Sequence, residues 1–166
     1  MKKIVLMLII SLFLLSGCSQ GAQETHVDNP YEIAKGTQIL SYYDKEENIK
    51  ISGFQVLENT LQNFQDKNNN ILVNDDGTIR CITITDETVK TYQSISVGDS
   101  VSKIEDAYEY EGKTNNLYSV LFHAGIEENP ANQNREDDWL LIFYYTDGSQ
   151  ITAIQIFDVK YGREFR

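Results

Sequence analysis

Two Asp-Gly dipeptides, each lying between two β-prone runs, constrain the fold of this chain most strongly. They are Asp76-Gly77 and Asp147-Gly148. The flanking runs are Ile71–Val73 and Ile79–Thr85 for the first dipeptide, and Trp139–Thr146 and Gln150–Val159 for the second. Asp-Gly readily adopts the backbone angles of a tight turn, so each dipeptide predicts a β-hairpin. Both halves of the chain are therefore expected to build antiparallel sheet.

A helix is expected ahead of the first hairpin. Phe54, Leu57, Leu61 and Phe64 follow one another at spacings of three, four and three, which places them on one helical stripe. A short strand over Asn48–Ser52 is expected just before this helix.

A second helix is expected after the Ile95–Gly98 segment. Asp99 and Ser100 are typical N-capping residues, and Val101, Ile104 and Tyr108 would then face inward with Ala107 beside them. A strand over Leu117–His123 and an acidic surface loop over Ala124–Asp138 complete this half.

The order of elements is thus helix then antiparallel sheet, twice. This order predicts an α+β fold made of tandem helix-plus-antiparallel-sheet units rather than a parallel α/β fold. The first unit spans residues 37–90 and the second spans residues 91–166.

The first seventeen residues have the pattern of an export signal. Lys2 and Lys3 precede an uncharged run of twelve residues, Ile4–Leu15. A helix that spans a bilayer needs about 20 apolar residues, so this run fits the core of a signal peptide better than a membrane span. The lysine pair would keep its start on the cytoplasmic side. The run ends in Leu15-Ser16-Gly17-Cys18.

Leu15-Ser16-Gly17-Cys18 resembles the lipobox of bacterial lipoproteins. The resemblance implies lipid transfer to the Cys18 thiol, cleavage between Gly17 and Cys18, and removal of residues 1–17. Two or three acyl chains, at about 0.8 kcal/mol per buried CH₂, make a stable anchor. Residues 18–36 are expected to form a lipidated, flexible tether, with the protein on the extracytoplasmic face of the cell membrane.

The net charge of the chain limits which partners it can bind, and its cysteine content limits whether a disulfide can stabilise it. Loss of Lys2 and Lys3 with the signal lowers the basic residues from 14 to 12 against 25 acidic ones, a net charge of −13. Such a surface repels nucleic acid, so nucleic-acid binding is excluded. With Cys18 lipidated, Cys81 has no partner for an intramolecular disulfide and is expected to be a small buried hydrophobe.

The second unit also resembles a known fold. Ile95–Ser100 followed by Val101, Ile104 and Tyr108 is similar to the opening of the beta-lactamase inhibitor protein-like fold, which the small outer-membrane assembly lipoproteins share. The segment Ile49–Thr85 resembles the first half of two-repeat Gram-positive lipoproteins with this fold, although Gly53 leads into Phe54 without a capping pair. The resemblance implies binding to other proteins and carries no shared catalytic residues.

The residues predict no catalytic site, no metal site and no cofactor. Gly98-Asp99-Ser100 lacks the second glycine of a nucleophile elbow and is explained by helix capping. The segment 66–77 has neither the glycine nor the glutamate that a calcium loop requires. His26 and His123 stand outside any cluster with metal-ligand spacing. A glycosidase-like pair of carboxylates stays open, because the separation of the many acids in space decides it.

The run Trp139–Tyr145 is aromatic or apolar on both of its faces. One interpretation is a buried central strand; the other is an exposed recognition surface, since aromatic residues are enriched at such surfaces. The residues expected to contact a partner are Trp139, Phe143, Tyr144 and Tyr145. The function expected from the sequence is a non-catalytic binding module for a protein or cell-wall partner. The alternatives are a structural accessory of an envelope assembly complex and, less favoured, a hydrolase.

Overall fold

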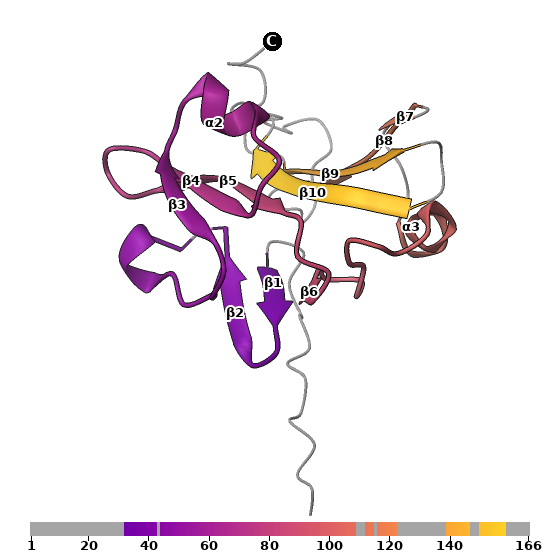
Figure 1. The fold of residues 1–166 in the computed structure, drawn as a ribbon, viewed down its shortest axis with the longest axis horizontal. Helices are drawn as coiled ribbons and strands as arrows, with labels where there is room; N and C mark the ends of the chain where they lie inside the picture. Colours follow the sequence, from indigo (N-terminus) through magenta and orange to yellow (C-terminus); the bar gives the residue numbers. More distant parts are fainter. Residues whose placement is uncertain are drawn as a thin grey trace, which may run out of the picture.

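One seven-stranded sheet organises the part of the chain that the structure describes, residues 32–42, 44–108, 112–114, 116–122, 139–146 and 150–158 (Figure 1). In this computed structural model the strand order is β3-β4-β5-β10-β9-β8-β7, and every neighbouring pair is antiparallel except β3 with β4. The strands are β3 (Gln55–Glu58), β4 (Asn70–Val73), β5 (Ile79–Ile84), β7 (Gly112–Lys113), β8 (Leu117–Phe122), β9 (Trp139–Thr146) and β10 (Gln150–Asp158). The described helices are short, so the fold is α+β with strands predominating.

The first hairpin is confirmed: the N–H of Asn74 donates to the Thr78 carbonyl at 3.0 Å, and the three residues between them form the turn. Strands β4 and β5 pair in antiparallel register, and the N–H of Gly77 donates to the carbonyl of Asn74 at 2.8 Å. Gly77 has φ +74°, a conformation that side-chain-bearing residues adopt at a cost. The strands of the second hairpin, β9 and β10, also pair as predicted; their connection, including Asp147-Gly148, lies outside the described residues.

Both faces of the sheet are covered near its centre. Successive residues of a strand point to opposite faces, so Ile154 and Phe157 of β10 lie on different sides. Helix α3 (Val101–Ala107) packs on the side of Ile154, which we call the α3 face, and helix α2 (Leu61–Gln65) packs on the side of Phe157, the α2 face. Each face of the sheet therefore carries one short helix, and the middle strands of the sheet are apolar on both sides.

Helix α3 confirms the second predicted helix. Val101, Ile104 and Tyr108 are buried, and the Tyr108 ring lies 5.7 Å from that of Phe143. The predicted capping chemistry is wrong in detail, because Ser100 occupies the N-cap position without a side-chain capping bond. Asp99 instead accepts a hydrogen bond from the Ser96 N–H at 2.8 Å and pairs with Lys103 at 2.8 Å, which secures the turn before the helix.

The predicted helix over Phe54–Phe64 is wrong over most of its length. Gln55–Glu58 forms strand β3 and pairs in parallel with β4, and only Leu61–Gln65 is helical. Thr60 separates the two elements, since its side chain accepts a hydrogen bond from the Asn63 N–H at 3.2 Å and caps α2. Leu61, expected to face inward, is 47% exposed. The helical spacing was thus overridden by strand pairing, which a local pattern does not reveal.

The predicted strand over 48–52 is also wrong. Glu46–Asn48 forms a single turn of 3₁₀ helix, η1, and Ile51 follows in a loop although it is buried. Ile51 therefore contributes to the core without belonging to a sheet.

A second, three-stranded sheet occupies the start of the described chain and corrects the extent of the tether. Its order is β2-β1-β6, with β1 at Glu32–Lys35, β2 at Gln38–Ser41 and β6 at Val89–Lys90. Ile33 and Ala34, placed by the sequence in the flexible tether, are buried. Gly36, with φ +59°, allows the turn that joins β1 to β2. The folded part therefore includes residues 32–36.

An ion pair fastens this small sheet to the rest of the molecule. Lys35 Nζ lies 2.7 Å from Asp86 Oδ2 and 3.1 Å from the Ser52 carbonyl oxygen. Asp86 also accepts hydrogen bonds from the N–H and hydroxyl of Thr88 at 2.8 and 2.6 Å. The bond from Lys35, together with those from Thr88, lowers the pKa of the Asp86 carboxyl to about 2 from its ordinary 3.8.

This pKa predicts a loss of stability in acid that depends on Asp86. Because the carboxylate is favoured in the folded state, its contribution is present above about pH 4 and disappears as the pH falls toward 2. Allowing for the partial exposure of the pair, we expect it to be about 1–2 kcal/mol. Urea unfolding at pH 5 and pH 2.5 should show this loss in the parent and not in Asp86→Asn. Equal losses in both proteins would contradict the assignment.

The two predicted units share one sheet. Strand β5, from residues 37–90, pairs directly with β10, from residues 91–166, and Ile84 stands opposite Ile154. The described sheet is therefore continuous across the proposed boundary at residue 90.

Candidate functional site

The aromatic run Trp139–Tyr145 lies in strand β9, which is a buried central strand in its described part rather than an exposed recognition surface. Phe143 and Tyr145 lie on the α3 face and are 0% and 4% exposed, so the expectation that they form an open surface is wrong. Tyr144 lies on the α2 face and is half-buried. Trp139 begins β9, and its side chain lies outside the described residues. Strand β9 has β8 on one side and β10 on the other, and helices cover both faces, which explains the two apolar rows.

A polar cluster lies beneath α2, at the centre of the α2 face. Gln155 of β10 is fully buried, and its Oε1 accepts hydrogen bonds from Lys67 Nζ and from the Tyr144 hydroxyl, each at 2.7 Å. Its Nε2 donates to the Phe64 carbonyl and to the Thr83 hydroxyl, each at 3.1 Å. The Gln155 amide thus uses both ends to tie α2 to strands β5 and β9.

The ionisable groups of this cluster are shifted toward their neutral forms. Burial lowers the pKa of the Lys67 ammonium below its ordinary 10.5, and Lys67 Nζ lies 4.6 Å from the centroid of the Tyr144 ring. Burial also raises the pKa of Tyr144 to about 12 and that of Cys81 to about 12. A thiol with so high a pKa is a poor nucleophile, and Cys81 is buried as the sequence predicts.

We interpret the cluster as a structural connection. Lys67 Nζ also reaches the Phe64 carbonyl at 3.3 Å, so its hydrogen bonds hold it against α2 rather than leave it facing solvent. Residue types alone did not reveal the cluster, because Lys67 and Gln155 are 88 positions apart. The signal in the sequence was a glutamine that interrupts the apolar run from Ala153 to Phe157.

Two substitutions distinguish the contribution of Gln155 to stability from that of Lys67. Gln155→Leu leaves the Tyr144 hydroxyl and the Lys67 ammonium without their shared acceptor, and we expect it to cost about 2–3 kcal/mol. Lys67→Met removes a half-buried charge and leaves Gln155 Oε1 bonded to Tyr144, so we expect a change below about 1 kcal/mol. Urea unfolding at pH 7 measures both. A larger loss for Lys67→Met than for Gln155→Leu would instead favour a role centred on the lysine.

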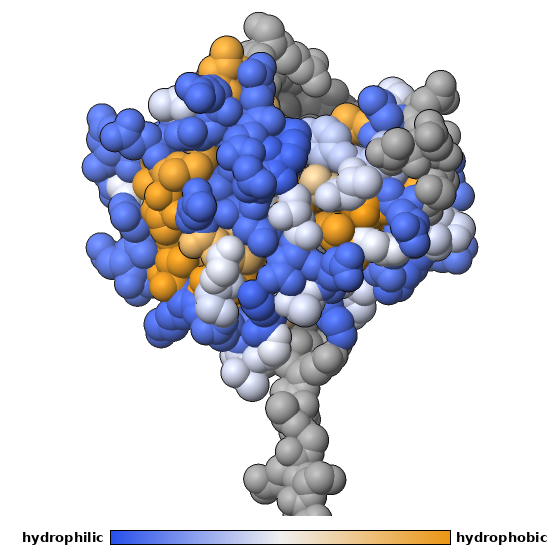
Figure 2. Space-filling view, in the orientation of Figure 1, coloured by the Kyte–Doolittle hydropathy of each residue, from blue (hydrophilic) through white to orange (hydrophobic). Residues whose placement is uncertain are grey.

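The second candidate is the outer edge of β3. In the parallel pair, the N–H of Gln55 donates to the Asn69 carbonyl and that of Asn59 donates to the Val73 carbonyl. The main-chain groups of the intervening Val56 and Glu58 therefore point away from β4, and among the described strands β3 is the last on this side of the sheet. Val56 is 39% exposed, and Figure 2 shows apolar surface gathered over β3 within a hydrophilic surround. An unpaired edge of this kind is a template for another strand.

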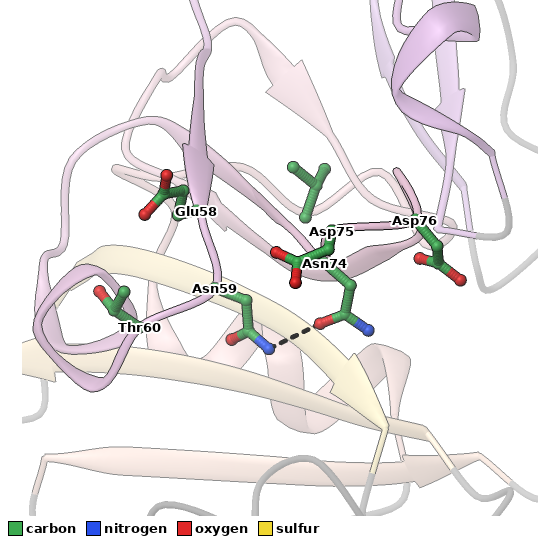
Figure 3. Close-up of a pocket in the computed structure, with 7 residues that line it drawn as sticks. Glu58, Asn59, Thr60, Asn74, Asp75 and Asp76 are labelled. Carbon is green, nitrogen blue, oxygen red and sulfur yellow. Dashed lines mark hydrogen bonds between the residues drawn. The ribbon is translucent and has the colours of Figure 1, made fainter.

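An acidic hollow of about 420 Å³ adjoins the end of β3 (Figure 3). It is lined by Glu58, Asn59, Thr60, Val73, Asn74, Asp75 and Asp76. Two of these lining residues are bonded to each other, since Asn59 Nδ2 donates to Asn74 Oδ1 at 2.8 Å and joins the ends of β3 and β4. Asp76 is partly neutralised by Lys45, 3.8 Å away, while no described cation pairs with Glu58 or Asp75.

Within the described residues, no group of three or more histidine, cysteine, aspartate or glutamate side chains is placed to hold a metal ion. The hollow presents the carboxyl groups of Glu58, Asp75 and Asp76. The described helices include none long and apolar enough to cross a bilayer. Cys18, Gly17 and the loop Ala124–Asp138 lie outside the described residues, so the structure does not place them.

No protein-family model, no curated protein and no solved structure matches this chain.

Proposed function

We propose that this chain is a bacterial lipoprotein, anchored to the extracytoplasmic face of the cell membrane by lipid on Cys18, that serves as a non-catalytic binding module for a protein partner. Leu15-Ser16-Gly17-Cys18, directly after an uncharged run of twelve residues, supports the anchor. The observation that supports binding is the open edge of β3, with main-chain groups directed outward and Val56 exposed beside them.

The surface offered to the partner differs from the one the sequence suggested. The described part of β9 supplies buried rings, so we assign the binding role to β3 and the acidic hollow next to it. The cluster around Gln155 supports this role indirectly, because it holds α2 against the sheet and α2 follows β3 in the chain. A fixed strand offers a partner a preformed edge, which reduces the entropy lost on binding.

The tandem-unit organisation is kept as part of this proposal. Residues 37–90 contribute β3, β4 and β5 to one half of the large sheet, and residues 91–166 contribute β7 to β10 to the other. Each half also carries one short helix, α2 or α3, on its own face. This distribution is compatible with the beta-lactamase inhibitor protein-like resemblance, whose members bind proteins.

Site-specific photocrosslinking in intact cells tests the binding role. A photoreactive phenylalanine analogue in place of Gln55, which is exposed on β3, should give a defined higher-mass adduct with an envelope protein. The same analogue in place of Ser102, exposed on α3, is the matched control and should give none. Adducts of equal yield at both positions, or none at either, would remove the support for a binding edge at β3.

A further inference from the structure

We propose that β3 binds an extended, cationic segment of the partner protein as an additional strand of the seven-stranded sheet. This inference rests on the proposed function and specifies the chemistry of the partner. The register of β3 with β4 determines which main-chain groups are open, since Gln55, Leu57 and Asn59 face β4. The N–H and carbonyl of Val56 and the N–H of Glu58 face the open edge, while the Glu58 carbonyl accepts from Asn63 Nδ2 at 2.8 Å.

The three outward main-chain groups of Val56 and Glu58 can form hydrogen bonds with a short added strand. Addition of an extended peptide to a sheet edge derives affinity from main-chain hydrogen bonds and specificity from alternate side chains. β3 has four residues, and it lacks the lysine and proline with which exposed edges are commonly protected. The edge is therefore open over a length that matches a peptide of about five residues.

The side chains beside the edge define the sequence of the added strand. Val56 and Glu58 lie on the same face of β3, because they are two positions apart. A residue opposite Val56 would extend the apolar surface, and a lysine or arginine two positions away would lie opposite Glu58. Opposite-charge and apolar cross-strand pairs both stabilise a sheet. The expected pattern is a basic residue and an apolar residue separated by one position.

Charge decides between a basic partner and a second copy of this chain. Glu58 and Asp75 face the acidic hollow at the end of the edge and pair with no described cation. The whole chain has a net charge of −11, so two copies repel each other, while a cationic segment is attracted to this surface. The observations therefore favour a basic peptide over self-pairing through β3.

A symmetric probe peptide tests the proposal in either strand direction. Blocked Lys-Thr-Val-Thr-Lys places valine opposite Val56 and lysine opposite Glu58 whether it pairs in parallel or in antiparallel orientation. Its binding to the full-length chain in detergent micelles is measured by fluorescence anisotropy. We expect blocked Glu-Thr-Val-Thr-Glu to bind at least about tenfold more weakly than the lysine peptide. Added salt should reduce the affinity of the lysine peptide. Amide exchange at Val56 and Glu58 should slow when the lysine peptide binds.

Matched variants at one position isolate the main-chain contact. Val56→Pro removes the outward N–H and should reduce affinity at least about tenfold relative to Val56→Thr, which keeps it. Neither change touches the bonds between β3 and β4, and continued protection of the Asn59 amide in both variants shows that the strand is intact. Glu58→Gln should reduce the affinity for the lysine peptide about threefold, and it should not reduce the affinity for the glutamate peptide.

Three outcomes would overturn the inference. They are equal affinity of Val56→Pro and Val56→Thr, equal binding of the two peptides, and a parent chain that self-associates through β3 and becomes monomeric on Val56→Pro. Each leaves the proposed function standing if the analogue at position 55 still forms its adduct in cells. Absence of that adduct, with the lysine peptide still bound, would count against the function and not against strand addition.

Discussion

The Cys18→Ser variant should lose its lipid completely and keep its signal peptide. In the proposed lipoprotein the Cys18 thiol carries the lipid and cleavage falls directly before this residue, so both events depend on Cys18. We expect labelled palmitate to enter the parent chain and not the variant. Mass spectrometry should find Cys18 at the start of the parent and residues 1–17 still attached in the variant. The loss of labelling should be complete, because the serine hydroxyl does not replace the thiol even in part.

Cys81→Ala is the matched control for this experiment. Cys81 is buried in β5 with a pKa raised to about 12, so neither exposure nor acidity makes it a competitor for lipid. Labelling should be the same as in the parent. Label retained by Cys18→Ser, or a mature chain that starts at another residue, would contradict the lipoprotein assignment while leaving the described fold unaffected.

Phe143→Ala should be among the most destabilising single substitutions in the described part of the chain. Its ring is fully buried in the central strand β9 and packs 5.7 Å from the ring of Tyr108. Truncation of a buried phenylalanine leaves a cavity and costs about 3–5 kcal/mol. That loss is a large fraction of the stability of a typical domain, so urea unfolding should show a much lower midpoint.

Leu61→Ala provides the comparison for Phe143→Ala. Leu61 is 47% exposed in the first turn of α2, so its truncation should cost less than about 1 kcal/mol. The pair distinguishes a core residue from a surface residue of similar hydrophobicity. A cost below about 1 kcal/mol for Phe143→Ala would indicate that β9 is not a central buried strand.

The sequence predicted the strands best where turn chemistry and strand-like composition agreed. Asp76-Gly77 and its flanking runs identify β4 and β5, and β9 matches its predicted range of Trp139–Thr146. The helix α3 was also predicted, because Val101, Ile104 and Tyr108 lie on the side that packs on the sheet. In these segments the local pattern and the tertiary environment favour the same structure.

The errors arose where distant pairing overrides a local pattern. Phe54 to Phe64 has helical spacing, yet Gln55–Glu58 pairs with β4. Glu32–Lys35 reads as a polar linker, although β2 and β6 pair with it on both sides and bury Ile33. The edge position of β3 was missed for the same reason, because whether a strand has one neighbour or two is a property of the whole sheet.

The Gln155 cluster was missed because its chemistry depends on segments far apart in the chain. A glutamine within the apolar run from Ala153 to Phe157 signals a buried polar contact, but its partners Lys67, Tyr144 and Thr83 come from three other segments. Contacts of this kind become visible only when the register of β5, β9 and β10 is known.

The position of β10 has a consequence for how the chain acquires its structure. The last described strand lies at the middle of the large sheet, between β5 and β9. Because synthesis proceeds from the N-terminus, β3, β4 and β5 are made well before the strand that completes them. Pairing of strands so far apart in the chain is slow, because the entropy of closing a large loop is lost before the strands make their stabilising contacts. Assembly of the sheet therefore waits for almost the whole chain. A product that stops before residue 150 keeps the described pairs β4–β5 and β8–β9 but leaves one edge of β5 and one edge of β9 without a neighbour, and such edges are prone to aggregation.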